Sequence, residues 1–121
     1  MKSDYYAQHQ RTVQLFKLEL QKILKNKIRI FDRHVGLFYT KNGAPIKINQ
    51  KGMSDLYAIL KTSHGLIHLE FEIKTGNARQ SKDQKNWEKI INELNGLYFV
   101  VRKPKNDALK IFDILKSLKY V

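Results

Sequence analysis

The segment from Ile67 to Lys74 constrains the fold most strongly, because its residues alternate between two chemical classes. Successive side chains of a β-strand point to opposite faces. One face then carries only apolar residues, and the other carries only ionisable ones. The apolar set is Ile67, Leu69, Phe71 and Ile73, and the ionisable set is His68, Glu70, Glu72 and Lys74. The apolar face must pack against a hydrophobic layer. The row of ionisable side chains on the other face requires a chemical explanation.

Apolar residues recur at helical spacing elsewhere in the chain, which predicts helices. These helices cover residues 8–26, 81–95 and 106–118. Apolar runs predict further strands at residues 28–31, 35–39, 55–60 and 97–101, and a polar loop at 40–52. The turn at Ser63-His64-Gly65 predicts that the 55–60 strand and the 66–74 strand form a hairpin.

A helix lies between this hairpin and the last strand, so that strand is expected to run parallel to a neighbour. The predicted fold class is α/β, with a mixed central β-sheet flanked by helices on both faces. The predicted order is a helix, three or four strands, a helix, a strand and a helix, which with three strands is α-β-β-β-α-β-α, in a single domain over residues 1–121.

The chain carries 23 Lys and Arg against 11 Asp and Glu, a formal charge of +12. Nucleic acid is the first partner that such an excess suggests, and an anionic membrane surface is the second. A basic protein without a special partner is the alternative. The absence of cysteine excludes disulfides and thiolate metal sites. The polar beginning and the lack of an apolar span predict a cytoplasmic protein with no membrane partner.

Antiparallel pairing about the turn would place Asp55 across from the far end of the second strand, near Glu72 and Lys74. The face that each side chain takes stays open, because the register is unknown. Two carboxylates can hold Mg²⁺, which takes oxygen ligands and keeps several waters. Such an ion polarises a phosphodiester and lowers the pKa of a bound water, and a nearby lysine can orient that water.

The pattern D-(x16)-E-x-K resembles the PD-(D/E)xK nuclease superfamily, and more narrowly its VRR-NUC (virus-type replication-repair nuclease) domain. The similarity runs from about residue 28 to 103. Its matching stretches are Lys51-Gly52-Met53-Ser54-Asp55-Leu56, Glu72-Ile73-Lys74-Thr75 and Ser81-Lys82-Asp83-Gln84, followed by the strand Leu97–Val101 and Arg102.

The resemblance implies a restriction-endonuclease-like core and a metal-dependent DNA endonuclease. Asp55, Glu72 and the backbone carbonyl of Ile73 would bind Mg²⁺, with Mn²⁺ as an alternative. Lys74 would be the catalytic lysine, and Gln84 would position water or phosphate. The substrate would be branched or junction DNA in phage or mobile-element replication or repair, and the protein would be a homodimer.

The sequence departs from the family at Ser54, where a proline is usual. It departs again in the first helix, which offers only Glu19 as an acidic residue near the metal. Whether the site would bind one or two metal ions therefore stays open.

Lys51, Arg79, Lys82 and Lys85 are the candidate phosphate contacts, although lysines on a helix are also typical of a solvated face. Ser81 and Gln84 have the form of a capping box, so Gln84 has a structural alternative too. Glu70 is interpreted as solvated or as the partner of a cation, and the four histidines as ordinary residues.

Two rivals to the junction nuclease remain. A non-catalytic basic nucleic-acid-binding module explains the charge equally well, but not the order of Asp55, Glu72 and Lys74. A restriction-type endonuclease of the same fold is the second rival. The short chain argues against it, because little length is left for a domain that reads bases.

Overall fold

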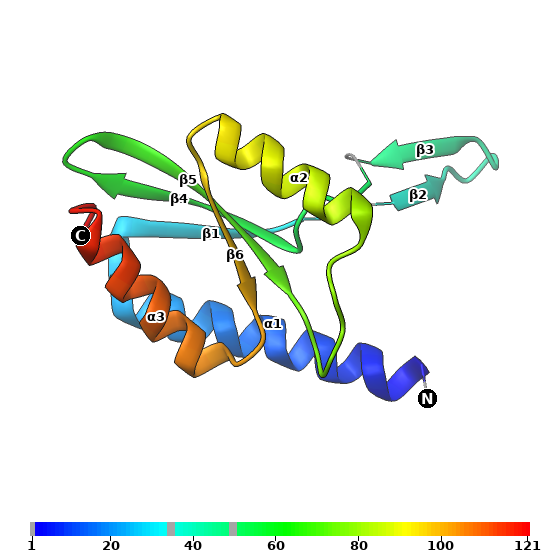
Figure 1. The fold of residues 1–121 in the computed structure, drawn as a ribbon. Coiled ribbons are helices and arrows are strands. Elements are labelled where there is room, and N and C mark those ends of the chain that lie inside the picture. Colours follow the sequence, from blue (N-terminus) through cyan, green and yellow to red (C-terminus); the bar gives the residue numbers. More distant parts are fainter. Residues whose placement is uncertain (1, 34–35, 49–50) are drawn as a thin grey trace.

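The computed structural model describes residues 2–33, 36–48 and 51–121 and is drawn in Figure 1. Its helices are α1 (Lys2–Leu24), α2 (Lys82–Glu93) and α3 (Pro104–Ser117), with a short 3₁₀ turn η1 (Lys25–Lys27) after α1. Its strands are β1 (Ile28–Asp32), β2 (Gly36–Tyr39), β3 (Pro45–Ile48), β4 (Leu56–Thr62), β5 (Gly65–Ile73) and β6 (Leu97–Val101).

Four strands form the central sheet, in the spatial order β1-β4-β5-β6. β4 pairs antiparallel with both β1 and β5, whereas β5 and β6 are parallel. The predicted hairpin is thus β4–β5, and α2 is the crossover that leads to the parallel strand β6. The α/β class and the mixed sheet are confirmed.

The prediction for residues 40–52 was partly wrong. A polar loop was expected there, but β3 pairs with β2 in a separate two-stranded sheet that projects from the domain. A tight turn joins the two strands, with Gly43 at a φ of 81° and its N–H donating to the carbonyl of Thr40. The strand expected over 35–39 is present from Gly36, and Val35 lies outside the described residues. The strand β3 is therefore an addition to the predicted elements, between β2 and β4.

The first helix begins earlier than predicted, at Lys2 rather than Gln8. Asp4 lies in its first turn, where a negative charge is favourable beside the helix N-terminus. His9 lies within the range already predicted, and its ring reaches the end of β5 at the Ile73 carbonyl oxygen. Although α1 has 23 residues, no helix in the described part of the chain is long and apolar enough to cross a membrane.

Helices cover both faces of the sheet, as predicted (Figure 1). α1 and α3 lie against the apolar face, where Phe16 and Leu20 of α1 and Leu115 of α3 are fully buried with Phe71 of β5. α2 lies on the opposite face, over the ionisable side chains of β5. The carboxylates of β5 are therefore enclosed by a helix, which a solvated strand face would not need.

Phe16→Ala should remove the central contact of this core. The Phe16 ring lies edge-on to Phe71 with centroids 5.1 Å apart and has no exposed surface. Truncation of a buried phenylalanine costs about 3–5 kcal/mol in the free energy of unfolding. Urea denaturation measures this, with Leu18→Ala, on the same helix and 59% exposed, as the control that changes stability by less than about 0.5 kcal/mol. Similar losses in both variants would contradict the assignment of the α1 face.

Candidate functional site

The strand register settles where Asp55 lies. Leu56 pairs with Phe71, so Asp55, one residue earlier, stands beside Glu72 at the end of the hairpin. Asp55 Oδ2 accepts a hydrogen bond of 2.8 Å from the backbone N–H of Ile73. The structure therefore brings together Asp55, Glu72 and the Ile73 peptide, as the hairpin argument expected.

Glu72 is a buried carboxyl group with one unsatisfied oxygen. Its residue is 3% exposed, and its Oε1 accepts a hydrogen bond of 2.9 Å from the Gln84 amide. Its Oε2 is buried and has no hydrogen-bond partner among the described residues. Burial, together with the negative charge of Asp55, raises the pKa of Glu72 to about 8. Because buried polar atoms are nearly always paired, this oxygen is suited to a ligand that the chain does not supply.

Gln84 links the two charged members of the E-x-K pattern. Its side-chain oxygen accepts a hydrogen bond of 2.8 Å from the Lys74 ammonium, while its amide nitrogen donates to Glu72. The same oxygen accepts from the backbone N–H of Ser81, and Ser81 Oγ accepts from the backbone N–H of Gln84. The capping box is thus present, and one glutamine caps α2 and holds Lys74 and Glu72.

Glu70 is fully buried, so its interpretation as a solvated residue was wrong and the alternative of a cation partner is correct. The Arg33 guanidinium donates to both of its carboxylate oxygens. Trp87 Nε1 donates at 2.9 Å, and His68 Nε2 makes a further close contact. Burial alone would raise the pKa of Glu70, but the hydrogen bonds from Arg33, Trp87 and His68 hold it below the usual value.

His9 is a site residue that the sequence reasoning missed by interpreting all histidines as ordinary. Its Nε2 lies 3.1 Å from the carbonyl oxygen of Ile73 and 3.5 Å from Asp55 Oδ2. A signal was available, because His9 precedes Val13 by four residues and Phe16 by seven. All three share the core-facing side of α1, and all three lie within the helix that the sequence predicts over residues 8–26.

The acidic residue expected from the first helix does not reach the site. Glu19 forms an ion pair of 3.9 Å with Lys22 on α1 and lines neither of the hollows beside Asp55. On α1 it is instead the side chain of His9 that lies close to Asp55, with 3.5 Å between His9 Nε2 and Asp55 Oδ2.

Two hollows meet at Asp55. One, of about 350 Å³, is lined by Asp55, Glu72 and Gln84, together with Arg33, Ser81 and residues 51–54. The other, of about 230 Å³, lies on the α1 side, with His9 and Tyr6 in its wall. Gly52 shapes the first hollow, because a Cβ there would lie 2.4 Å from the Asp83 carbonyl oxygen. The 51–55 segment can therefore approach α2 closely only with glycine at this position.

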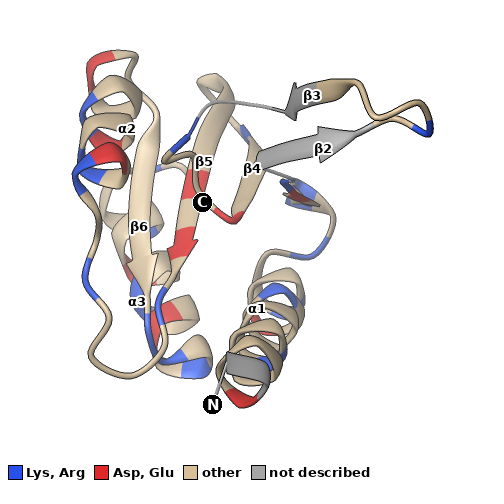
Figure 2. Cartoon of the chain, turned by 90° about the vertical axis from the view of Figure 1, so that its right-hand side faces the viewer, with Lys and Arg blue, Asp and Glu red and all other residues tan. Residues whose placement is uncertain are grey.

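The four candidate phosphate contacts all lie at the surface. Lys51 lines the larger hollow and pairs with Asp83 at 3.5 Å. Arg79, Lys82 and Lys85 are exposed in the loop before α2 and on its first turns. Figure 2 shows acidic segments within β5, while Lys and Arg are spread over helices and loops. Of the four candidates, Lys51 is thus the one that borders the hollow with the carboxylates, while Arg79, Lys82 and Lys85 are exposed without lining it.

The donor set suits a hard cation held by few protein ligands. Within residues 2–33, 36–48 and 51–121, no three His, Cys, Asp or Glu side chains form a ready metal cage. The candidates are the carboxylates of Asp55 and Glu72 and the carbonyl of Ile73, all oxygen donors. Mg²⁺ is commonly bound through one or two carboxylates with several retained waters, so these residues fit it.

Comparison of the chain with protein-family models, with curated proteins and with solved structures gives no match in any of the three. A functional argument for this chain therefore rests on its residues and their geometry.

The raised pKa of Glu72 predicts a pH-dependent stability. The carboxyl titrates near 4.5 when unfolded and near 8 when folded, so the folded state holds the proton more tightly. Its contribution to stability is complete below the unfolded pKa and is lost as the pH rises through the folded pKa. With a chelator present, chemical denaturation should show wild type losing more stability across this window than Glu72→Gln. Glu93→Gln, at an exposed position on α2, should follow wild type, and parallel curves for wild type and Glu72→Gln would contradict the assignment.

Proposed function

We propose that this chain is a metal-dependent nuclease of the PD-(D/E)xK type, similar to the VRR-NUC domain, that hydrolyses phosphodiester bonds in DNA. One observation carries the proposal. The buried Oε2 of Glu72 is unpaired beside Asp55, at the wall of a hollow that is open to a ligand. A divalent cation would coordinate that oxygen and would also relieve the repulsion between the carboxylates of Asp55 and Glu72.

Asp55, Glu72 and the Ile73 carbonyl would hold Mg²⁺, or alternatively Mn²⁺. When bound, the ion supplies Lewis-acid polarisation of the phosphate and a water of lowered pKa. The chain's own residues would do the rest. Gln84 holds the Lys74 ammonium near Glu72, where a positive charge can orient a water or stabilise the charge that develops on the phosphate.

His9 would have a positioning role in this site. Its ring contacts both the Ile73 carbonyl oxygen and Asp55 Oδ2, which are two of the three proposed ligand groups. A side chain that bridges both groups restricts their orientation. The distance between α1 and the end of the hairpin is thereby linked to the shape of the proposed cation site.

The arrangement of elements agrees with a restriction-endonuclease-like core. Leaving out the β2–β3 hairpin, the order is α1, β1, β4, β5, α2, β6, α3, as the resemblance implied. By the same resemblance, we propose branched or junction DNA as the substrate, a homodimer as the active form and a cytoplasmic role in phage or mobile-element replication or repair.

Cleavage of labelled DNA tests the proposal. Duplex, single-stranded, flap and four-way-junction DNA would be incubated with Mg²⁺, Mn²⁺ or EDTA. Wild type should cut only with metal, and Lys74→Ala should lower the rate by about 10²-fold or more, as expected for loss of a group that stabilises developing charge. Lys89→Ala, which removes an exposed lysine of α2, should retain activity. Binding without cutting under any metal would favour the non-catalytic module.

Gln84 can be separated from its capping role with a matched pair of variants. Ser81→Ala removes the cap and should cost about 0.5–2 kcal/mol of stability while leaving Lys74 and Glu72 bonded to Gln84. Gln84→Ala removes both functions. If Gln84 positions Lys74, cleavage should fall at least tenfold more in Gln84→Ala than in Ser81→Ala when both are compared well below their melting temperatures. Equal rates would leave Gln84 with a capping role alone.

A further inference from the structure

The face of the sheet that carries Glu70 and Glu72 is only partly covered. α2 lies over β5 and β6, whereas the same face of β1 and β4 remains open (Figure 1). Phe31 of β1 is 41% exposed and Ile59 of β4 is 36% exposed. Leu66 of β5, at 70%, is exposed as well, so this uncovered sheet face is a candidate contact surface.

The strand register defines this open face. Phe31 pairs with Tyr57, Arg29 pairs with Ile59, and Lys61 pairs with Leu66. Because side chains alternate along each strand and Ile28, Ala58 and Leu60 point to the core, these six residues share the opposite side. The open face is therefore Arg29, Phe31, Tyr57, Ile59, Lys61 and Leu66.

Three rings form a row across neighbouring strands of this face. Phe31 and Tyr57 stack with centroids 5.1 Å apart and planes at 22°, and Tyr57 and His68 with centroids 6.0 Å apart and planes at 22°. The Arg33 guanidinium lies 4.6 Å from the centre of the Tyr57 ring. β1 is an edge strand of the central sheet, so in the described part of the chain no further strand pairs with it beyond Phe31. A flat aromatic ligand can extend the row at this end.

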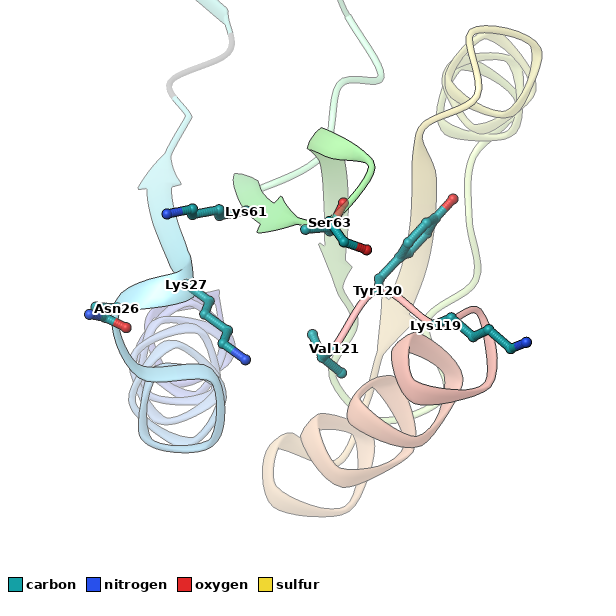
Figure 3. Close-up of a pocket in the computed structure, with 8 residues that line it drawn as sticks. Asn26, Lys27, Lys61, Ser63, Lys119, Tyr120 and Val121 are labelled. Atoms are coloured by element: carbon teal, nitrogen blue, oxygen red, sulfur yellow. The ribbon is translucent and has the colours of Figure 1, made fainter.

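Cations continue along the face away from the carboxylates. Arg29 and Lys61 are exposed, and Lys61 borders a hollow of about 600 Å³ together with Lys27 and Lys119 (Figure 3). Figure 3 shows these lysines pointing in different directions rather than converging. The hollow is thus no cage for one anion, and its charge suits a polyanion that runs past it.

We infer that the open face binds an unpaired strand of nucleic acid, with a base stacked at Phe31 and phosphates near Arg29 and Lys61. Aromatic side chains beside cations are the usual elements of single-strand binding, because every base has a flat face to stack. Tyr57 lies two residues along β4 from Asp55, which corresponds to about 7 Å. If the proposed function holds, on which this last step rests, the substrate carries a single-stranded arm that leads into the site.

The charge of the face argues against a second copy of the chain as its occupant. Arg29 and Lys61 of one copy would meet the same residues of another if the face paired with itself, and like charges placed opposite each other destabilise such contacts. A polyanion is attracted by the same residues.

Fluorescence anisotropy in EDTA tests the inference without cleavage. The probes are labelled oligo(dT), oligo(U) and a blunt DNA duplex of equal length. Phe31→Ala should weaken single-strand binding about tenfold, since loss of one stacked base amounts to that order. Its effect on duplex binding should be less than twofold. Ile114→Ala is the matched control, because Ile114 is 43% exposed on α3, on the other side of the sheet.

Lys61→Ala should weaken binding and reduce the slope of log K against log salt by about 0.7, as expected for one lost phosphate contact on a single strand. Equal weakening of oligo(dT) and oligo(U) would identify the bases and phosphates as the recognised groups, whereas a preference for one would assign the face to DNA or to RNA. Unchanged single-strand affinity in Phe31→Ala would overturn the inference. The inference would also be overturned if Phe31→Ala lost self-association in sedimentation, relative to wild type, while its oligonucleotide binding stayed unchanged.

Failure of the inference and failure of the proposed nuclease can be told apart. Metal-dependent cutting, together with no effect of Phe31→Ala on single-strand binding, would overturn only the inference that the open face binds a single strand. Single-strand binding that depends on Phe31, without cutting under any metal, would support the inference about the open face and overturn the proposal of nuclease activity.

Discussion

The buried carboxylate of Glu70 sets the constraint on which the arrangement of the site depends. A charged group without exposure is tolerated only when its oxygens are hydrogen-bonded. Its donors come from three places, namely Arg33 after β1, Trp87 on α2 and His68 on β5 itself. Satisfying one charge therefore fixes the end of β1 and the helix α2 relative to β5. Apolar packing alone would not specify that position so narrowly.

Arg33 transmits this constraint to the candidate metal ligands. Its backbone N–H donates to the Asp55 carbonyl at 3.0 Å, and its guanidinium lies 3.4 Å from the Ser54 carbonyl oxygen. The segment that carries Asp55 is thus held by the same residue that neutralises Glu70. α2 completes the link, because Trp87 bonds Glu70 and Gln84, one turn earlier, bonds Glu72. The placement of Asp55 beside Glu72 follows from these contacts.

Local sequence patterns were enough to predict the β4–β5 hairpin, the two faces of β5 and the proximity of Asp55 to Glu72. Each of these depends on residues close in sequence or on the two-residue alternation of side chains along a strand. The role of Arg33 could not be predicted, since its contact with Glu70 spans 37 residues and no spacing rule connects them. His9 lies within the predicted helix, but its role was missed because its contacts with Asp55 and Ile73 span 46 and 64 residues, which no spacing rule connects. Of the β2–β3 hairpin, the strand β2 was predicted, whereas β3 was missed because it is short and lies in a mostly polar segment.

Glu70 and Glu72 lie on one face of one strand, yet the fold treats them oppositely. The pKa of Glu70 is lowered by its donors, whereas burial and Asp55 raise that of Glu72 to about 8. Four donor atoms surround the first carboxylate, while the second keeps a buried oxygen unpaired. A carboxyl group retained only for structure would be completed like Glu70 or replaced by an apolar residue, which is often neutral or stabilising. The unfavourable burial of Glu72 beside Asp55 therefore supports the proposal that a ligand, rather than the chain, completes this site.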